Sequence, residues 1–236
     1  SSDKVKKVQK DFEATHVRPQ RLMKTLFTDE AYVKANVDEA RLMRRLFDLA
    51  CNMQSHDTDM QLYSLFTDEE CYDLWSCNNL YWYLTHACSP VTDGLMPYRE
   101  ADLLRNILDR ADAALKEGKN QATLRFGHES CLLPLVALLE LNHYGESYPD
   151  VEKLSEQWRA YDIFPMASNV QFVFFHKKGS NDVLVKVLLN EKETKLPVKT
   201  DVAPYYHWKD VESYYREKLD KYQHISVSYT HLTLPT

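Results

Sequence analysis

The chain has 236 residues, of which 44% are hydrophobic, 12% aromatic and 27% charged. This composition predicts a globular protein with a real core and excludes an intrinsically disordered chain. The formal net charge of −6 gives no general attraction to nucleic acid or acidic membranes, and no apolar run approaches the roughly 20 residues of a membrane span.

The first half of the chain predicts helices. Apolar residues recur at spacings of three and four in four runs: Arg18 to Phe27, Val37 to Met53, Asp68 to Leu84 and Tyr98 to Lys116. Helix-start signals lie at Pro19, at Asp38 before Glu39, and at Thr67, which forms a capping box with Glu70. We therefore expect a mainly helical region up to about Gly118.

After Gly118 the pattern changes to mixed strand and helix. The segment Ala122 to Phe126 predicts a short strand. It is followed by a turn at Gly127 and by a predicted helix over Cys131 to Leu141. Farther along, Val170 to His176 and Val183 to Leu189 predict the two strands of a hairpin around residues 178–181. Tyr205 to Tyr222 predicts a terminal helix.

The two ends and the cysteines carry further expectations. Residues 225–236 (ISVSYTHLTLPT) are expected neither to continue the terminal helix nor to pair as a strand, which indicates a non-native tail. Ser1 to Lys10 has neither an initiating Met nor the apolar segment of a signal peptide, so we expect a cut N-terminus. The five cysteines include no C-x-x-C pair, and Cys71 and Cys77 are candidates for a disulfide.

His128 and Glu129 lie at the predicted junction of strand, turn and helix. Gly127 lets the backbone turn or approach a ligand closely, and the first turn of the helix offers free N–H groups and a positive dipole end to a phosphate. A protonated His128 here can hydrogen-bond a phosphoryl oxygen while Glu129 protonates the leaving oxygen. The ordinary interpretation also stands, in which His128 caps the helix or bonds a carbonyl and Glu129 is an acidic residue near a helix start.

General acid catalysis by Glu129 needs a protonated carboxyl, so we expect activity to be favoured at mildly acidic pH. Arg125, three residues before His128, is the candidate substrate-binding residue. The remaining histidines, His86, His143, His176 and His207, have no metal-ligand spacing.

The segment Gly127 to Leu135 (GHESCLLPL) resembles the C-terminal motif of the histidine phosphatases of the acid phosphatase and phytase branch. That motif is H-D or H-A-E on a strand-to-helix turn, and the multiple inositol polyphosphate phosphatase group continues it as L-L-P-L. Matching segments run from about residue 10 to residue 220, among them Leu65-Phe66-Thr67, Met166 to Val170 and Val185 to Glu191.

Two departures from the family pattern are present. The H-A-E form has its acid at the position of Ser130, whereas here Glu129 directly follows the histidine. The R-H-G-x-R motif, which carries the nucleophilic histidine of the family, does not occur in the 236 residues. The resemblance therefore implies that this fragment alone is inactive.

The resemblance implies an α/β fold, a mixed sheet flanked by helices with an inserted helical domain, here only partly present. Residues 1–117 would be part of the helical domain, residues 118–224 the C-terminal part of the α/β core, and residues 225–236 the non-native tail.

The implied activity is phosphomonoester hydrolysis through a phosphohistidine whose nucleophile lies outside this fragment, with Glu129 as proton donor. Substrates would be inositol polyphosphates such as phytate, with 2,3-bisphosphoglycerate as a second candidate. The resemblance implies no metal or organic cofactor, no nucleic-acid partner and a periplasmic or secreted location. The alternative is a non-catalytic helical and α/β module that binds phosphate or a partner.

Overall fold

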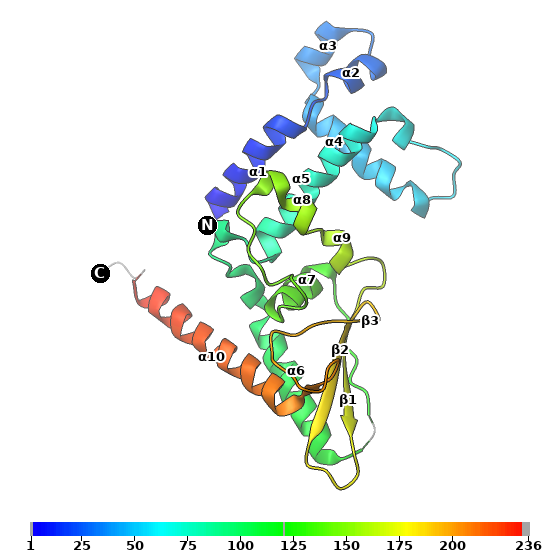
Figure 1. Cartoon of the computed structure of the whole chain (residues 1–236). Coiled ribbons are helices and arrows are strands. Elements are labelled where there is room, and N and C mark those ends of the chain that lie inside the picture. The colour runs from blue at the N-terminus through cyan, green and yellow to red at the C-terminus, as the bar shows by residue number, and fades with distance from the viewer. Residues whose placement is uncertain (1, 120, 233–236) are drawn as a thin grey trace. The chain divides into compact units, whose positions relative to one another are not determined.

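The computed structural model of the chain describes residues 2–119 and 121–232 (Figure 1). The chain forms two compact units, Ser1–Trp82 and Tyr83–Thr236. The boundary between them falls within helix α5 (Asp68–His86). The domain boundary expected after residue 117 stays a prediction.

The first unit is helical. Its elements are α1 (Ser2–His16), α2 (Gln20–Leu26), α3 (Glu30–Asn36), α4 (Glu39–Asn52), the 3₁₀ turns η1 (Met53–Ser55) and η2 (Tyr63–Leu65), and the first part of α5. The predicted start signals are confirmed. The Asp38 side chain accepts a hydrogen bond from the Arg41 amide, and Thr67 and Glu70 exchange both bonds of a capping box.

The apolar faces of these helices form one core. Leu22 and Met43 are 0% and 1% exposed, and they belong to a cluster with Val17, Met23, Val33, Ala50, Phe66 and Leu74. An ion pair joins Arg44 on α4 to Glu13 on α1. Helices α1 and α3 were not among the predicted runs, although both lie in the region predicted to be helical.

The second unit combines helices with a small sheet. After the end of α5 its helical elements are η3 (Pro90–Thr92), η4 (Met96–Glu100), α6 (Ala101–Glu117), α7 (Glu129–Leu138), η5 (Val151–Lys153), α8 (Leu154–Gln157), α9 (Ala160–Ile163) and α10 (Trp208–Leu232). Its strands are β1 (Val170–His176), β2 (Val183–Leu189), β3 (Lys192–Glu193) and β4 (Tyr206–His207).

The sheet is antiparallel throughout the described residues. Strands β1 and β2 form the predicted hairpin, in register from Val170 opposite Leu189 to His176 opposite Val183. Strands β3 and β4 both pair with β2. The inward side chains of β2, Val185 and Val187, are fully buried. The predicted fold class, an α/β arrangement of a sheet flanked by helices, is confirmed.

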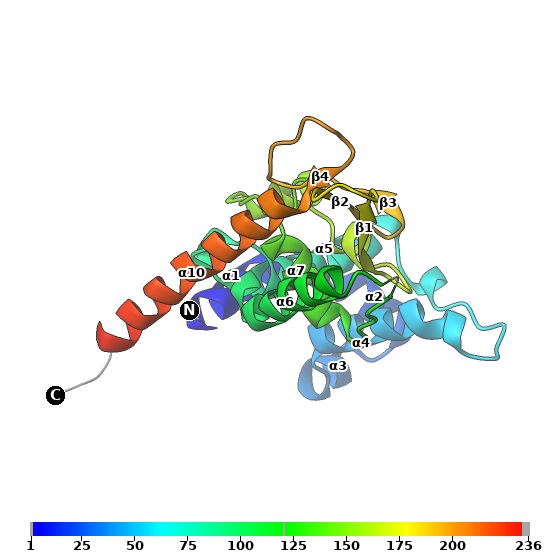
Figure 2. The ribbon, with the colours of Figure 1, turned by 90° about the horizontal axis from the view of Figure 1, so that it is seen from below.

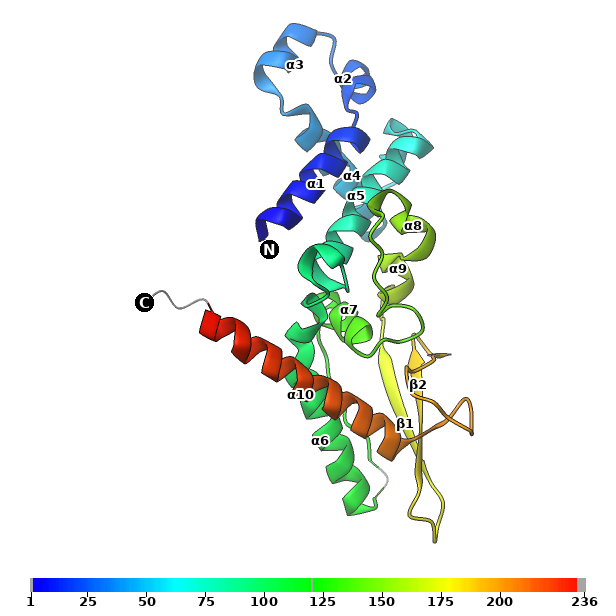
Figure 3. The ribbon, with the colours of Figure 1, turned by 60° about the vertical axis from the view of Figure 1, so that its left-hand side comes forward.

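Helix α7 is the centre of this unit. Its residues Leu133 to Leu138 are buried, because the helix carries apolar side chains on every face from Leu132 onward. Helix α10 contacts both α6 and the sheet (Figures 1 and 3). It also holds the C-terminal end of α7, since Tyr215 Oη donates to Leu139 O at 2.7 Å and Lys218 Nζ donates to Leu138 O at 2.6 Å.

Three predictions about local structure are wrong. Residues 122–126 form no strand, because the described part of the chain supplies no neighbouring strand to pair with them. Residues 225–232 continue α10 instead of ending it, and residues 233–236 lie outside the described residues. Cys71 and Cys77 are free thiols, as are the other three cysteines.

No helix in residues 2–119 or 121–232 is both long and apolar enough to cross a bilayer.

Candidate functional site

His128 is the residue at which helix α7 begins. Its backbone is extended, with φ −105° and ψ 165°, and its carbonyl accepts hydrogen bonds from the Cys131 and Leu132 amides at 3.0 and 3.1 Å. The backbone of His128 therefore starts the helix. Its imidazole makes no capping bond and is exposed. In the described residues the side chain is thus not used to cap the helix, and it remains available to a ligand.

Glu129 is the first residue of α7, and its side chain is also exposed. A carboxylate at this position is favoured by the positive end of the helix dipole. The backbone amides of Glu129 and Ser130 have no acceptor among the described residues. The first turn of α7 therefore presents two unpaired N–H groups beside the imidazole and the carboxylate, and the role of this turn as a phosphate site stays a prediction.

One buried histidine, His86, senses Glu129, and the sequence analysis did not relate the two residues. His86, the last residue of α5, is 7% exposed and bonds Thr85 Oγ1 through Nδ1 at 2.7 Å. Burial lowers the pKa of His86, Arg99 on η4 lowers it further, and Glu129 opposes both effects. Helix η4 packs against α7, and Arg99 and Glu129 both lie within electrostatic range of His86 at the end of α5.

Arg125 is held by helix α6. Its Nη2 donates to Asn106 Oδ1 at 2.8 Å, and the guanidinium remains exposed. Among the described residues Arg125 makes no hydrogen bond or ion pair with His128 or Glu129. The structure therefore places this predicted substrate ligand on the exposed segment before α7, with its charge unpaired by any carboxylate in the described chain.

The segment before α7 forms an open surface. Residues 121–131 are exposed, with Leu124 at 76% and Phe126 at 94%. A side chain added at Gly127 would meet no atom within 4 Å, so the described residues do not themselves require glycine there. Two cavities of about 370 and 380 Å³ lie elsewhere, one lined by Asp112 and Trp208 and the other by Cys51 and Tyr63.

The described part of the chain was also compared with the ligand sets that bind metal ions. It contains no group of three or more His, Cys, Asp or Glu side chains placed to hold a metal ion. The chemistry available near α7 is that of a histidine, a carboxylate, two arginines and backbone amides, which suits an anionic ligand.

Comparison with known protein families assigns the chain to one of them. The family model for the histidine phosphatase superfamily (branch 2) matches residues 1–190. The chain belongs to this superfamily. The match includes His128 and Glu129, and the predicted resemblance to histidine phosphatases is confirmed.

Individual relatives within the histidine phosphatase superfamily point to one group. Human multiple inositol polyphosphate phosphatase 1 is 28% identical over 134 residues, which cover 51% of this chain and 27% of the human protein. The multiple inositol polyphosphate phosphatase of Bifidobacterium longum has a similar fold. Its complex with phosphate gives a TM-score of 0.64 at 21% identity, covering 75% of this chain and 40% of that one.

The complex of the same bacterial phosphatase with inositol hexasulfate gives a TM-score of 0.60 at 22% identity, covering 75% of this chain and 38% of that one. The chain thus spans less than half the length of each of these relatives.

Proposed function

We propose that the protein is a histidine phosphatase that hydrolyses phosphomonoesters of inositol polyphosphates. Phytate is the first substrate candidate and 2,3-bisphosphoglycerate the second. Membership of the histidine phosphatase superfamily supports the reaction type. The substrate class is supported by the human relative, which is a multiple inositol polyphosphate phosphatase, and by the bacterial relative, which binds phosphate and inositol hexasulfate.

The observation that carries the proposal is the exposed pair His128 and Glu129 on the uncapped first turn of α7. In this proposal a protonated His128 donates a hydrogen bond to a phosphoryl oxygen, together with the free amides of Glu129 and Ser130. Arg125, three residues before His128, adds an exposed positive charge close in sequence to this turn. Such local charge matters because the chain as a whole has a net charge of −6.

The proposed reaction has two steps. A histidine outside the 236 residues attacks phosphorus, the bond to the leaving oxygen breaks, and Glu129 gives its proton to that oxygen. Water then attacks the phosphohistidine, the phosphorus–nitrogen bond breaks, and the Glu129 carboxylate takes the proton of the water. Because the first step needs a protonated carboxyl, the proposal predicts a rate that falls as the pH rises from mildly acidic values.

One observation favours a second candidate for the chain as it stands. The R-H-G-x-R motif does not occur in its 236 residues, so these residues offer a phosphate-binding turn without the nucleophile of the family. The second candidate is therefore a module that binds phosphate without turnover. Release of phosphate from inositol phosphates by the full-length protein distinguishes the two, since only the phosphatase liberates phosphate.

The decisive experiment measures phosphate release from phytate by the full-length protein and its Glu129→Gln variant. Loss of the general acid is expected to slow turnover by roughly 10²-fold or more, whereas Glu30→Gln, at the exposed first residue of α3, leaves it unchanged. Equal rates in all three proteins would remove Glu129 from the mechanism. His128→Ala is expected to weaken inhibition by inorganic phosphate as well as turnover, and unchanged inhibition would exclude the phosphate-ligand role.

A further inference from the structure

His207 lies between two carboxylates at the edge of the sheet. Its Nδ1 is 3.0 Å from both oxygens of Asp182, which directly precedes β2. Its Nε2 is 2.9 Å from Asp201 Oδ1, in the loop between β3 and β4. The imidazole is 29% exposed and occupies strand β4, opposite Leu184 of β2. One histidine therefore connects the start of β2 to a loop far from it in the sequence.

The chemistry of these contacts defines the protonation state they need. An ionised carboxylate accepts hydrogen bonds but cannot donate one, so both ring nitrogens of His207 must carry a proton. Only the imidazolium has two N–H groups. A neutral imidazole would turn a lone pair toward one of the two carboxylates, and that contact would become repulsive. Deprotonation of His207 must therefore break one of its two connections.

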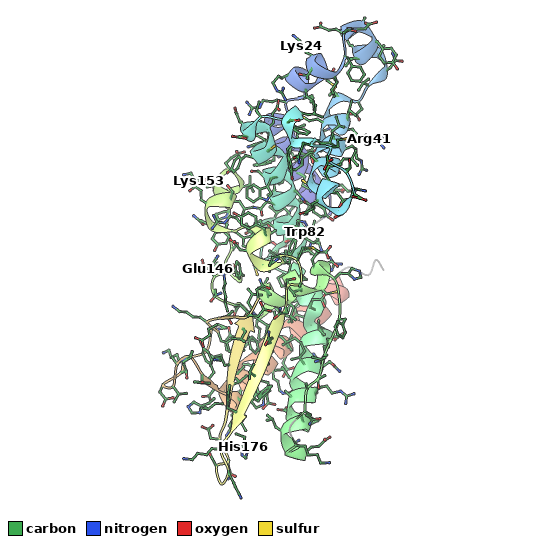
Figure 4. The ribbon with its side chains drawn as sticks, turned by 90° about the vertical axis from the view of Figure 1, so that its right-hand side faces the viewer. Lys24, Arg41, Trp82, Glu146, Lys153 and His176 are labelled. Atoms are coloured by element: carbon green, nitrogen blue, oxygen red, sulfur yellow. The ribbon has the colours of Figure 1, made fainter. Side chains whose placement is uncertain are left out.

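The other charged groups around β4 are engaged elsewhere or lie on separate elements. Lys186 on β2 donates to Glu193 at 3.0 Å and places its ammonium over the ring of Tyr205. His176 on β1, at the end of the hairpin in Figure 4, contacts the Ser180 carbonyl at 2.7 Å. Further titratable groups on neighbouring elements are Lys177 and Lys178 in the β1–β2 turn, Lys192 on β3, Lys195, Lys199 and Tyr205 in the loop, Tyr206 on β4, and Lys209 and Asp210 at the start of α10. The charges that act on His207 are those of Asp182 and Asp201.

The two contacts differ in strength. Asp182 offers both oxygens to Nδ1 and its side chain is 51% exposed, whereas Asp201 offers one oxygen to Nε2 and is 83% exposed. The neutral ring therefore keeps its proton on Nδ1, next to Asp182, and releases Asp201. We propose that His207 is a pH-sensitive latch that holds the loop of residues 195–205 against the sheet when protonated and releases it when neutral.

The ends of the loop have attachments of their own, so the latch matters for the order of its middle. At its start, the Lys195 amide donates to Asn142 Oδ1 at 3.0 Å and the Lys195 carbonyl accepts from the Asn142 amide at 2.9 Å. The Leu196 amide donates to Tyr206 Oη at 3.0 Å, and Thr200 Oγ1 donates to the Tyr205 carbonyl at 2.7 Å. The loop forms the arch that joins β3 to β4 in Figure 2. The hydrogen bond from His207 Nε2 to Asp201 joins the middle of this arch to strand β4.

The direction of the pH response follows from the charges. Hydrogen bonds from His207 to Asp182 and to Asp201 raise the pKa of the imidazole above its ordinary value of 6.5, and burial opposes them. His207 in turn lowers the pKa of Asp201. The stabilisation by the imidazolium is fully present below the pKa of a histidine in the unfolded chain. It is lost as the pH rises through the raised pKa of His207.

The test follows the ring nitrogens and the loop amides of the protein across the pH range. Nitrogen NMR of His207 is expected to show two protonated ring nitrogens at about pH 5.5 and a single proton on Nδ1 at about pH 9. Hydrogen exchange, corrected for intrinsic rates, is expected to show protection of Leu196 and Val202 falling by roughly two- to fivefold over that range, the scale of an exposed ion pair.

Two variants make the result specific. In Asp201→Asn the amide can accept from a protonated Nε2 or donate to a neutral one, so the pH dependence of loop protection is expected to disappear. His176→Gln alters the other histidine of the same hairpin and is expected to keep the dependence. A neutral ring protonated on Nε2, or an unchanged pH dependence in Asp201→Asn, would overturn the proposal.

Discussion

Removal of one hydroxyl from α10 tests whether that helix holds α7 in place. Tyr215 is 0% exposed, and its Oη donates to the Leu139 carbonyl at the C-terminal end of α7 at 2.7 Å. Tyr215→Phe keeps the ring and deletes the donor. Among the described residues the Leu139 carbonyl has no other donor, so the variant leaves a buried acceptor unpaired, at a cost of about 1–3 kcal/mol.

Thermal and urea unfolding measure this cost. For a chain of this size the loss corresponds to a fall of roughly 2–12 °C in the unfolding midpoint. Tyr32→Phe is the matched control, because the side chain of Tyr32 is 54% exposed and its hydroxyl makes no hydrogen bond within the described chain. Hydrogen exchange should show a larger loss of amide protection in α7 than in the β1–β2 hairpin. If Tyr215→Phe were as stable as Tyr32→Phe, the argument that α10 supports α7 through this bond would be refuted.

Other side chains give tests of single interactions. Thr67→Ala removes the cap of α5 and is expected to lower the free energy of unfolding by about 1 kcal/mol, whereas Thr67→Ser retains the oxygen and most of the stability. The hydrogen bond from Arg21 lowers the pKa of Glu70. The stability from this pair is therefore present above 4.5, the ordinary pKa of a glutamate, and is lost as the pH falls through the lowered pKa. Glu70→Gln should flatten the fall in the free energy of unfolding at acid pH. Burial raises the pKa of Cys77 to about 12, so very little of its thiol is ionised at pH 8, and mass spectrometry after alkylation should show the exposed Cys51 and Cys131 modified before Cys77.

The elements that depend on local signals were predictable from the sequence. Strands β1 and β2 have the predicted bounds because their β-branched and aromatic runs are separated by turn residues. Helix α4 begins at Glu39, directly after its capping residue Asp38 and two residues after the predicted run starts at Val37. In both cases a few neighbouring residues contain all the information that the element needs.

The elements that depend on distant partners were not predictable in this way. Ala122 to Phe126 has strand-like residues, but a strand is stabilised by hydrogen bonds to another strand, which the local sequence cannot supply. The terminal helix shows the opposite error. No Gly or Pro occurs from Trp208 to Leu232, and helical hydrogen bonds are local, so nothing in the chain stops α10 before Leu232.

The candidate site combines both kinds of information. His128 and Glu129 could be found because they are adjacent and precede an apolar helix. His86 and Arg99 could not, since each lies at the end of a different element and no spacing relates them to Glu129. Their proximity arises from the packing of η4 on α7, which becomes visible only in three dimensions.

The way α7 is held also bears on how its first turn would act on a phosphate. The buried residues Leu133 to Leu138 and the bonds from α10 to Leu138 and Leu139 fix the helix at its C-terminal end. His128 and Glu129, at the other end, make no side-chain hydrogen bond within the described chain. A ligand that engages them therefore breaks no existing bond, while the backbone that carries them stays fixed. Such a combination lowers the cost of binding, and under the proposed mechanism it would place the Glu129 carboxyl reproducibly against a leaving oxygen.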